Sequence, residues 1–371
     1  MDYSVFDRPI ESNLPFAIYK LPDKEEVNLI LQNDDNVRII NDVEDTFNQK
    51  GFIISPFVNS KQTPAISIRP DFHVKGMNEI VNFLRNFFRN DIIFNKSEYY
   101  KDNTIDDFEK YKKSFEIFHN ALINKQYEKL VLSRELIIQK RNDFSAGKIF
   151  ERAVKKYSNA FIYLLNSLQT GTWFGCSPEV LFSGKNNEWR TAALAGTRKT
   201  ESEKLDWDCK NITEQRIVVD FIKEQLENLQ IKFNKGESYT VRAGNIEHCK
   251  VDFTFTLDSL EKAGILLKAL HPTPAVSGYP KDEAIKFITE NENYERLYYS
   301  GFTGPVNISG STDLFVNIRC MQMLNNEFRL YAGSGLTKAS ELNGEWFETE
   351  YKLQTLFSLF ETELQHVISL H

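Results

Sequence analysis

Histidine and cysteine are scarce in this 371-residue sequence, which contains six His and four Cys. The cysteines Cys176, Cys209, Cys249 and Cys320 lack the spacing of a metal site, and a chain of this length needs no disulfide framework. We therefore expect free thiols in a reducing, cytoplasmic compartment. If the protein uses a metal, carboxylates are its expected ligands, and carboxylates favour a hard cation.

An excess of positive charge and long apolar runs are also lacking. The chain has 45 Lys and Arg against 52 Asp and Glu, a formal net charge of −7. Such a balance disfavours nucleic acid and anionic membranes as partners. No apolar run approaches the ~18 residues of a membrane span, and the N-terminal MDYSVFDRPI lacks the basic and apolar regions of a signal peptide. The glycine-rich nucleotide motifs are absent too, which disfavours nucleotide-loop enzymes.

Aromatic residues are plentiful, and 29 Phe and 15 Tyr supply enough core material to exclude a disordered chain. Residues 1–115 are rich in Asn and Asp and carry no motif. We predict that they form a variable N-terminal part, that 116–371 form the catalytic region, and that both belong to one intertwined structural domain.

The order of apolar patterns predicts the fold class. Strands cluster together and do not alternate with helices, which favours an α+β fold with a large antiparallel β-sheet core flanked by helices. Strands are predicted at 51–58, 65–70, 129–139, 161–166, 172–177, 179–184, 299–307, 313–323 and 327–333. Helices are predicted at 77–88, 104–126, 203–230, 257–269, 280–292 and from 344 into the 360s.

The C-terminal helix places Glu345, Glu348 and Lys352 on one face, with Phe347 and Tyr351 on another. The polar face is either solvated, with an i,i+4 ion pair between Glu348 and Lys352, or part of a binding site.

Glycines favour the second interpretation. Gly333, Gly335 and Gly344 lie just before or at the start of this helix, and glycines so dense usually allow close backbone approach to a ligand or a tight turn.

A second carboxylate, Glu214, lies in the helix predicted at 203–230, with Lys210 and Asn211 on its polar side. It is either a surface residue or one of two glutamates that hold a hard cation such as Mg²⁺ together with several waters.

Three other charged residues have two interpretations each. Arg319 lies within the strand predicted at 313–323, either as an edge-strand residue or as a fork that binds a carboxylate. Lys129 opens a strand, where it faces solvent or, if desolvated, acts as a base. Glu179 is either a strand-edge charge or a site residue. His271, in a proline-rich loop, is expected to be structural.

These features become specific only in combination. Eight ordered segments within about 125–355 together resemble the chorismate-utilising enzymes, which include isochorismate synthase, anthranilate synthase component I, aminodeoxychorismate synthase component I and salicylate synthase. The segments are KLVLSR (129–134), GCSPEVLF (175–182), ALAGTRK (193–199), KNITEQ (210–215), HPTPAVSGYP (271–280), VNIRC (316–320), YAGSG (331–335) and GEWFETEYKL (344–353).

The resemblance implies a role for each matched position. Lys129 would be the general base that activates water, and Glu179 the general acid that protonates the departing C4 hydroxyl. Glu214 and Glu348 would hold Mg²⁺, with Glu345 beside the metal or acting through water. The substrate-binding positions would be Gly196, Thr197, His248, Ala275, Arg319, Gly333 and Lys352.

Within the family, the HPTPAVSG and LAGT forms are similar to isochorismate synthase. Ala195 stands where aminodeoxychorismate synthases have a nucleophilic lysine, and the proline-rich loop differs from that of anthranilate synthases. The resemblance implies Mg²⁺-dependent conversion of chorismate to isochorismate by a monomer without a glutaminase subunit, for menaquinone or siderophore biosynthesis. Salicylate synthase and anthranilate synthase component I are the alternatives in the same class, and a non-catalytic chorismate-binding protein is the alternative outside it.

Overall fold

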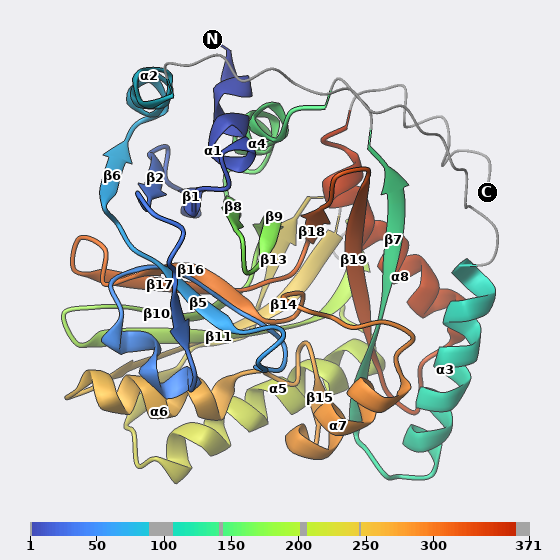
Figure 1. Cartoon of the computed structure of the whole chain (residues 1–371). Coiled ribbons are helices and arrows are strands. Elements are labelled where there is room, and N and C mark those ends of the chain that lie inside the picture. Colours follow the sequence, from blue (N-terminus) through green and yellow to red (C-terminus); the bar gives the residue numbers. More distant parts are fainter. Residues whose placement is uncertain (1, 89–106, 141–143, 201–205, 245, 361–371) are drawn as a thin grey trace.

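The computed structural model describes residues 2–88, 107–140, 144–200, 206–244 and 246–360, which build two antiparallel sheets (Figure 1). The first sheet has the strand order β15 (Gly278–Tyr279), β7 (Lys129–Gln139), β19 (Glu327–Leu336), β18 (Cys320–Met323), β9 (Gly171–Ser177), β8 (Phe161–Ser167), β1 (Phe16–Lys20), β2 (Val27–Leu31) and β6 (Phe72–Lys75). The second has the order β12 (Phe233–Lys235), β14 (Ile246–Thr256), β11 (Glu188–Lys199), β10 (Val180–Lys185), β17 (Ser311–Val316), β16 (Phe302–Val306), β4 (Gly51–Ser55), β5 (Ala65–Ile68) and β3 (Arg38–Ile40), and β13 (Tyr239–Ala243) pairs with β14.

The two sheets face each other, and helices cover their outer sides. One buried cluster lies between the sheets and includes Tyr163, Trp173 and Phe315. The strands β1, β2 and β4 pack on both faces, and all their residues are buried. Their sequences are therefore mostly apolar and do not alternate between apolar and polar residues. The fold is therefore α+β with an antiparallel core flanked by helices, as predicted.

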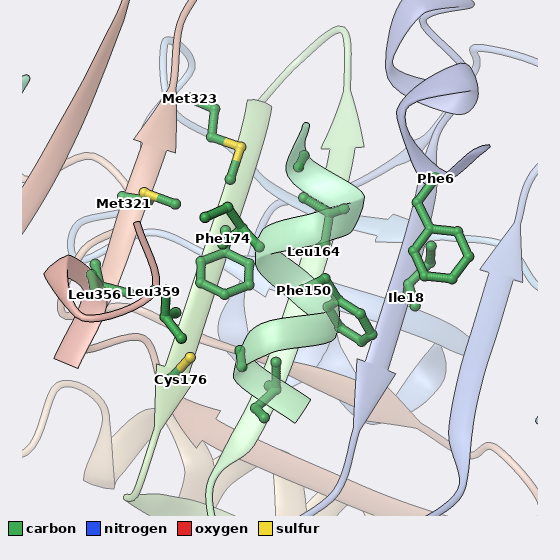
Figure 2. Packing of buried hydrophobic residues seen from close by; sticks show 14 of the residues in the cluster. Phe6, Ile18, Phe150, Leu164, Phe174, Cys176, Met321, Met323, Leu356 and Leu359 are labelled. Atoms are coloured by element: carbon green, nitrogen blue, oxygen red, sulfur yellow. The ribbon is translucent and has the colours of Figure 1, made fainter. Parts of the chain in front are cut away.

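Two further buried clusters form beneath the helices. The outer face of the first sheet packs against α1 (Arg8–Glu11), α2 (Met77–Phe87), α4 (Ala146–Lys156) and the end of α8 (Leu342–Phe357), and Figure 2 shows Phe6, Phe150, Leu164, Phe174 and Leu356 within this cluster. The outer face of the second sheet packs against α5 (Cys209–Asn228) and α6 (Leu260–Leu270). The remaining helices are α3 (Asp107–Ile123), α7 (Lys281–Asn291) and the short 3₁₀ turns η1 (Tyr3–Asp7) and η2 (Val43–Asn48).

Strands from the first 75 residues belong to both sheets. β1 pairs with β8, and β4 pairs with β16, so segments far apart in the sequence are neighbours in space. No helix in the described ranges is long and apolar enough to cross a membrane.

The strand predicted at 313–323 is wrong, because the chain changes sheets in the middle of it. β17 ends at Val316 in the second sheet, and β18 begins at Cys320 in the first. Arg319, between them, has a left-handed backbone with φ +51°. The predicted alternation of inward and outward residues therefore stops at Val316, and Arg319 lies in a crossover, not on a strand.

The other predicted elements are present with shifted ends. The strand predicted at 299–307 begins only at Phe302, and the helix predicted to start near 344 begins at Leu342. The predicted helix starts at 104 and 203 lie outside the described residues. The sequence patterns missed the helices α1 and α4 and the strands β1, β2, β3, β6 and β11 to β15.

Candidate active site

A two-stranded ribbon passes from one sheet into the other and carries two predicted site residues at its bend. β9 continues through Pro178 and Glu179 into β10, while β17 continues through Arg319 into β18. These strands pair on both sides of the bend, since Gly175 faces Cys320 and Val180 faces Phe315. The bend therefore brings an acid and a guanidinium together where the two sheets meet.

Hydrogen bonds fix the bend. Ser177 Oγ donates to the carbonyl oxygen of Val316 at 2.6 Å, and Val316 N donates to the carbonyl oxygen of Glu179 at 3.0 Å. Glu179 is 4 % exposed. Burial raises the pKa of Glu179 to about 8, even though the charges of Lys129, Lys352 and Arg319 oppose the shift. A carboxyl in this position keeps its proton at neutral pH, as a general acid must.

Arg319 is held by His248, a residue of β14. Arg319 Nη2 lies 3.0 Å from His248 Nε2, and Nη1 donates to Thr355 Oγ1 at 3.0 Å. Burial, assisted by the charges of Arg319 and Lys352, lowers the pKa of His248 to about 3. The imidazole is therefore neutral and accepts the hydrogen bond from Arg319.

A bulge in β11 forms the next wall of the site. Pairing between β11 and β14 shifts register between Ala195 and Thr197, and Gly196 has φ +73°, a conformation that favours glycine. Thr197 N donates to Asn211 Oδ1 at 2.9 Å, so the first turn of α5 braces the bulge.

Glycines clear one face of the pair β7 and β19. Val131 faces Gly335 and Ser133 faces Gly333 across this ladder, and residues two apart share a face. A Cβ at Gly335 would lie 2.1 Å from Glu214 Oε1 and 2.9 Å from Lys129 Cε. Gly335 therefore leaves the space that the Glu214 and Lys129 side chains occupy, while close approach to a ligand stays a prediction.

Gly333 and Gly344 have different surroundings. A Cβ at Gly333 would lie 2.8 Å from the hydroxyl of Tyr299, so this position also needs glycine. At Gly344, in the first turn of α8, a Cβ would meet no atom within 4 Å, so the protein itself does not require glycine there.

Lys129 is fully buried, so the alternative of a solvent-facing strand start is wrong. Its Nζ lies 3.0 Å from Glu214 Oε1 but has no hydrogen bond of acceptable geometry to any described residue. Burial lowers the pKa of Lys129, against the opposing charge of Glu214. Burial alone would raise the pKa of Glu214, but Lys129, Lys210 and Lys352 outweigh it and lower this pKa to about 2.

Three carboxylates surround the ammonium of Lys210. Lys210 Nζ lies 3.3 Å from Glu214 Oε2, 3.1 Å from Glu345 Oε1 and 3.9 Å from Glu348 Oε2. Glu345 Oε2 is buried without a hydrogen-bond partner among the described residues. We call Glu214, Glu345 and Glu348 the carboxylate trio.

The carboxylate trio has the oxygen donors and the concentrated negative charge that suit a hard cation. With Lys210 between them, the three glutamates do not form a ready-made metal site, and the described residues contain no other group of His, Cys, Asp or Glu that does. The trio therefore fits Mg²⁺ once Lys210 no longer fills its centre.

The polar face of α8 points inward. Glu345 is 4 % exposed, whereas Phe347 and Tyr351 are 54 % and 38 % exposed. The alternative of a solvated polar face is therefore wrong. Lys352 Nζ donates to Glu348 Oε1 at 2.6 Å, the predicted i,i+4 pair, and also to the carbonyl oxygen of Gly333 at 2.8 Å.

The pocket enclosed by these elements contains about 570 Å³ of space outside atoms, some of it open to solvent. Nine of the eleven predicted site residues line it: Glu179, Gly196, Thr197, Glu214, His248, Ala275, Arg319, Gly333 and Lys352. Lys129 contacts the lining residue Glu214, and Glu348 contacts the lining residue Lys352. Neither belongs to the lining.

Sequence reasoning missed two tyrosines and one cation. Tyr299 and Tyr331 line the pocket with their rings stacked, 5.3 Å between centroids. Tyr299 begins the strand predicted at 299–307, and Tyr331 begins the family segment YAGSG (331–335). Lys210 precedes Glu214 by four residues, and this helical spacing could have predicted their contact.

Comparisons with known proteins identify the family of this chain. The family model described as "Chorismate binding enzyme" matches residues 54–361. Isochorismate synthase EntC of Escherichia coli is 30% identical over 245 residues, 63% of each chain. Isochorismate synthase MenF of Haemophilus influenzae is 29% identical over 244 residues, 63% of this chain and 56% of the relative. The matched part of the chain thus spans less than two thirds of the length of these relatives.

A solved structure extends the likeness to nearly the whole chain. The menaquinone-specific isochorismate synthase MenF of Escherichia coli superposes with a TM-score of 0.78 at 19% identity, covering 97% of this chain and 92% of that one. At this identity the likeness concerns the fold. Because the family model spans most of the sequence, the chain belongs to the chorismate-binding enzyme family.

Proposed function

We propose that this protein is an isochorismate synthase, an isomerase that converts chorismate into isochorismate. The observation that carries the proposal is a buried carboxyl, Glu179, whose pKa is raised by burial to about 8 and which lies in the same pocket as the cations Arg319 and Lys352. Chorismate is a dianion that must lose a ring hydroxyl. The pocket offers positive charge for its carboxylates and a proton for the leaving oxygen.

The reaction exchanges one hydroxyl for another. Water adds at C2, the ring double bond shifts, and the C4–O bond breaks. Glu179 gives its proton to the C4 oxygen, which leaves as water, and Lys129 takes the proton of the attacking water. Because hydroxide is a poor leaving group, the acid and the base each contribute on the order of 10²- to 10⁴-fold.

Lys129 can act as the base only in its neutral form. Burial favours this form, whereas the charge of Glu214, whose Oε1 lies 3.0 Å from Lys129 Nζ, opposes it. The close carboxylate Glu214 holds Lys129 near the pocket wall. Gly335 leaves the space in which both side chains fit.

Glu214 and Glu348 would hold Mg²⁺, with Glu345 next to it. When bound, the ion would neutralise the ring carboxylate of chorismate and orient the ring. Arg319 and Lys352 would bind the carboxylates, and the neutral His248 would keep the guanidinium of Arg319 directed along the pocket.

The residue at position 195 favours water as the nucleophile. Ala195 lines the pocket, so no lysine amine is available there for attack on the ring. The protein would therefore need no glutaminase subunit to supply ammonia. We also propose that it acts in the cytoplasm as a monomer, in menaquinone or siderophore biosynthesis.

Product analysis tests the proposal. The protein is incubated with chorismate and Mg²⁺, with and without ammonia, and the products are separated by chromatography. Isochorismate without pyruvate is the expected result. Salicylate with pyruvate, or anthranilate in the presence of ammonia, would assign the alternative enzymes, and chorismate binding without any product would assign a non-catalytic protein.

Three matched samples assign the roles. Lys129→Ala and Glu179→Gln are expected to abolish turnover while leaving chorismate binding largely intact. Lys262→Ala, which changes an exposed lysine on α6, should keep normal activity.

Removal of the metal tests the cation site. EDTA should remove activity and Mg²⁺ restore it, whereas full activity of the metal-free protein would refute the carboxylate trio as a required cation site.

A further inference from the structure

Lys210 occupies the centre of the carboxylate trio, and this arrangement has a consequence for metal binding. Its ammonium contacts Glu214 and Glu345 at 3.3 Å and 3.1 Å and lies 3.9 Å from Glu348. These three glutamates come from α5 and α8, two helices that do not neighbour each other in the sequence. An ammonium between three carboxylates does electrostatically what a small metal cation would do in the same place.

Lys210 supplies a counter-charge to the whole cluster. Its ammonium approaches all three carboxylates of the trio, whereas Lys129 lies next to Glu214 alone and Lys352 pairs with Glu348. Without Lys210 the trio would lose this counter-charge in a largely buried region, which is costly unless another cation replaces it.

A divalent cation and the Lys210 ammonium cannot share the centre. Metal–oxygen distances of about 2.0–2.1 Å are typical for Mg²⁺, and a second cation a few ångströms away would be strongly repelled. Lys210 must therefore leave when the metal enters. It is placed to do so, because it lies in the first turn of α5 and its side chain is 18 % exposed, whereas the Glu214 and Glu345 side chains are 6 % and 5 % exposed.

We propose that Lys210 is a built-in competitor of the divalent cation, filling the carboxylate trio in the metal-free protein and swinging toward solvent when the metal binds. The inference rests on the proposed function only for the identity of the metal site. It assigns to Lys210 a role that neither the acid–base pair nor the substrate-binding residues perform. Its effect is to give the trio a counter-charge without metal, and its presence weakens the affinity for metal.

Direct binding of Mn²⁺, without substrate, tests this competition. Mn²⁺ is titrated into the metal-free protein, and the free ion is followed by electron paramagnetic resonance. Lys210→Met, which keeps the length of the side chain without its charge, is expected to bind Mn²⁺ at least tenfold more tightly than the wild type. Lys223→Met, on the same helix and in an exposed pair with Glu227, should bind like the wild type.

Thermal unfolding of the same samples separates competition from a purely structural role. Metal-free Lys210→Met should melt at a lower temperature than the wild type, because the trio loses its counter-charge, and saturating Mn²⁺ should raise its melting temperature more than that of the wild type. A variant that melts lower and binds Mn²⁺ no more tightly would show that Lys210 only stabilises the fold, and would overturn the proposal.

Chemical labelling reports the movement itself. Reductive methylation of lysines, read by mass spectrometry, should modify Lys210 slowly in the metal-free protein and several-fold faster with Mn²⁺, while Lys223 reacts equally in both. Unchanged labelling of Lys210 would contradict its displacement. Since none of these measurements uses chorismate, failure here leaves the product analysis standing, and failure of the product analysis leaves this competition standing.

Discussion

Arg319 and His248 form a buried hydrogen bond in which the guanidinium Nη2 lies 3.0 Å from the imidazole Nε2. His248 Nδ1 lies 3.0 Å from the carbonyl oxygen of Gly196, which can only accept, so Nδ1 carries the hydrogen and Nε2 is free to accept from Arg319. The histidine therefore links the bulge in β11 to the crossover that carries the guanidinium. It acts through its neutral form and orients Arg319.

Replacing His248 should weaken substrate binding more than catalysis. His248→Leu leaves one donor of Arg319 unpaired, and losing a hydrogen bond to a charged group costs about 1.5–3 kcal/mol, or roughly a 10- to 100-fold rise in KM for chorismate. His248→Gln, which can still accept, should recover part of this loss. Steady-state kinetics across pH 5.5–8 check both points.

The same kinetics test the charge state of the histidine. Because the pKa of His248 is lowered to about 3, KM should show no inflection near pH 6.5. An inflection there that disappears in His248→Gln would contradict a neutral histidine. A fall in kcat without a rise in KM would contradict its positioning role.

Glu179 should make both activity and stability depend on pH. Its pKa is raised by burial to about 8, so kcat should fall about tenfold per pH unit above this value as the acid loses its proton. Between its ordinary value of 4.5 and about 8 the folded state binds the extra proton, so the free energy of unfolding falls as pH rises through this window.

The stability effect can be separated from activity with Glu179→Gln, which cannot ionise. One pKa unit corresponds to about 1.4 kcal/mol. From pH 6 to pH 8 the wild type should therefore lose about 2 to 3 kcal/mol relative to Glu179→Gln in urea unfolding. An equal difference between the two proteins at both pH values would show that Glu179 ionises normally in the folded state.

Much of the site was predictable because its residues lie in short, ordered segments. The shared face of Glu345, Glu348 and Lys352 on α8 and the pair Glu348–Lys352 follow from helical periodicity applied to a few residues. Such local patterns fix which side chains share a face. They do not fix which face is buried, and in α8 the aromatic face is the exposed one.

Features that depend on contacts between distant segments were not predictable. The sheet change between β17 and β18 breaks an alternating pattern that reads as one continuous strand, because local sequence does not record which sheet each half joins. The strands β1, β2 and β6 lie in a region without motifs, and their positions depend on pairing with β8 and with each other. For the same reason the sequence did not predict that Lys210 contacts Glu345 and Glu348, because these two carboxylates come from the distant helix α8.

The buried pair of Arg296 and Glu292 should stabilise the folded position of the proline-rich loop 271–280. Arg296 donates to the carbonyl oxygens of Val276 and Val131 at 2.7 Å and 2.8 Å, and Glu292 accepts from Ser133 N at 2.9 Å. The pair thus ties the proline-rich loop to β7. Arg296→Met leaves Glu292 buried without its partner and should lower the free energy of unfolding by about 3–5 kcal/mol in urea titrations.

An exposed ion pair provides the comparison for this loss. Lys262 and Asp258 lie 2.7 Å apart with both side chains more than half exposed, so Lys262→Ala should cost less than about 1 kcal/mol. Arg296→Met combined with Glu292→Leu should recover part of the stability, because no unpaired charge stays buried. A double variant as unstable as the sum of both single variants would show that the two residues act independently.

Gly335 and Gly344 provide a matched pair of alanine substitutions near the same site. In Gly335→Ala the new Cβ would lie 2.1 Å from Glu214 Oε1 and 2.9 Å from Lys129 Cε, so both side chains must move. A displacement of about 1 Å can cost roughly 100-fold in rate, and we expect kcat/KM to fall by this order.

In Gly344→Ala the Cβ meets nothing within 4 Å and lies inside α8, where alanine is favoured over glycine by about 0.5–1 kcal/mol. This variant should keep normal kcat/KM and melt at a slightly higher temperature. Steady-state kinetics and thermal unfolding of both variants decide the matter. If Gly335→Ala kept full activity while folded, the close packing of Glu214 and Lys129 against β19 would not be needed for the reaction, and the assignment of Lys129 as the base would lose its structural support.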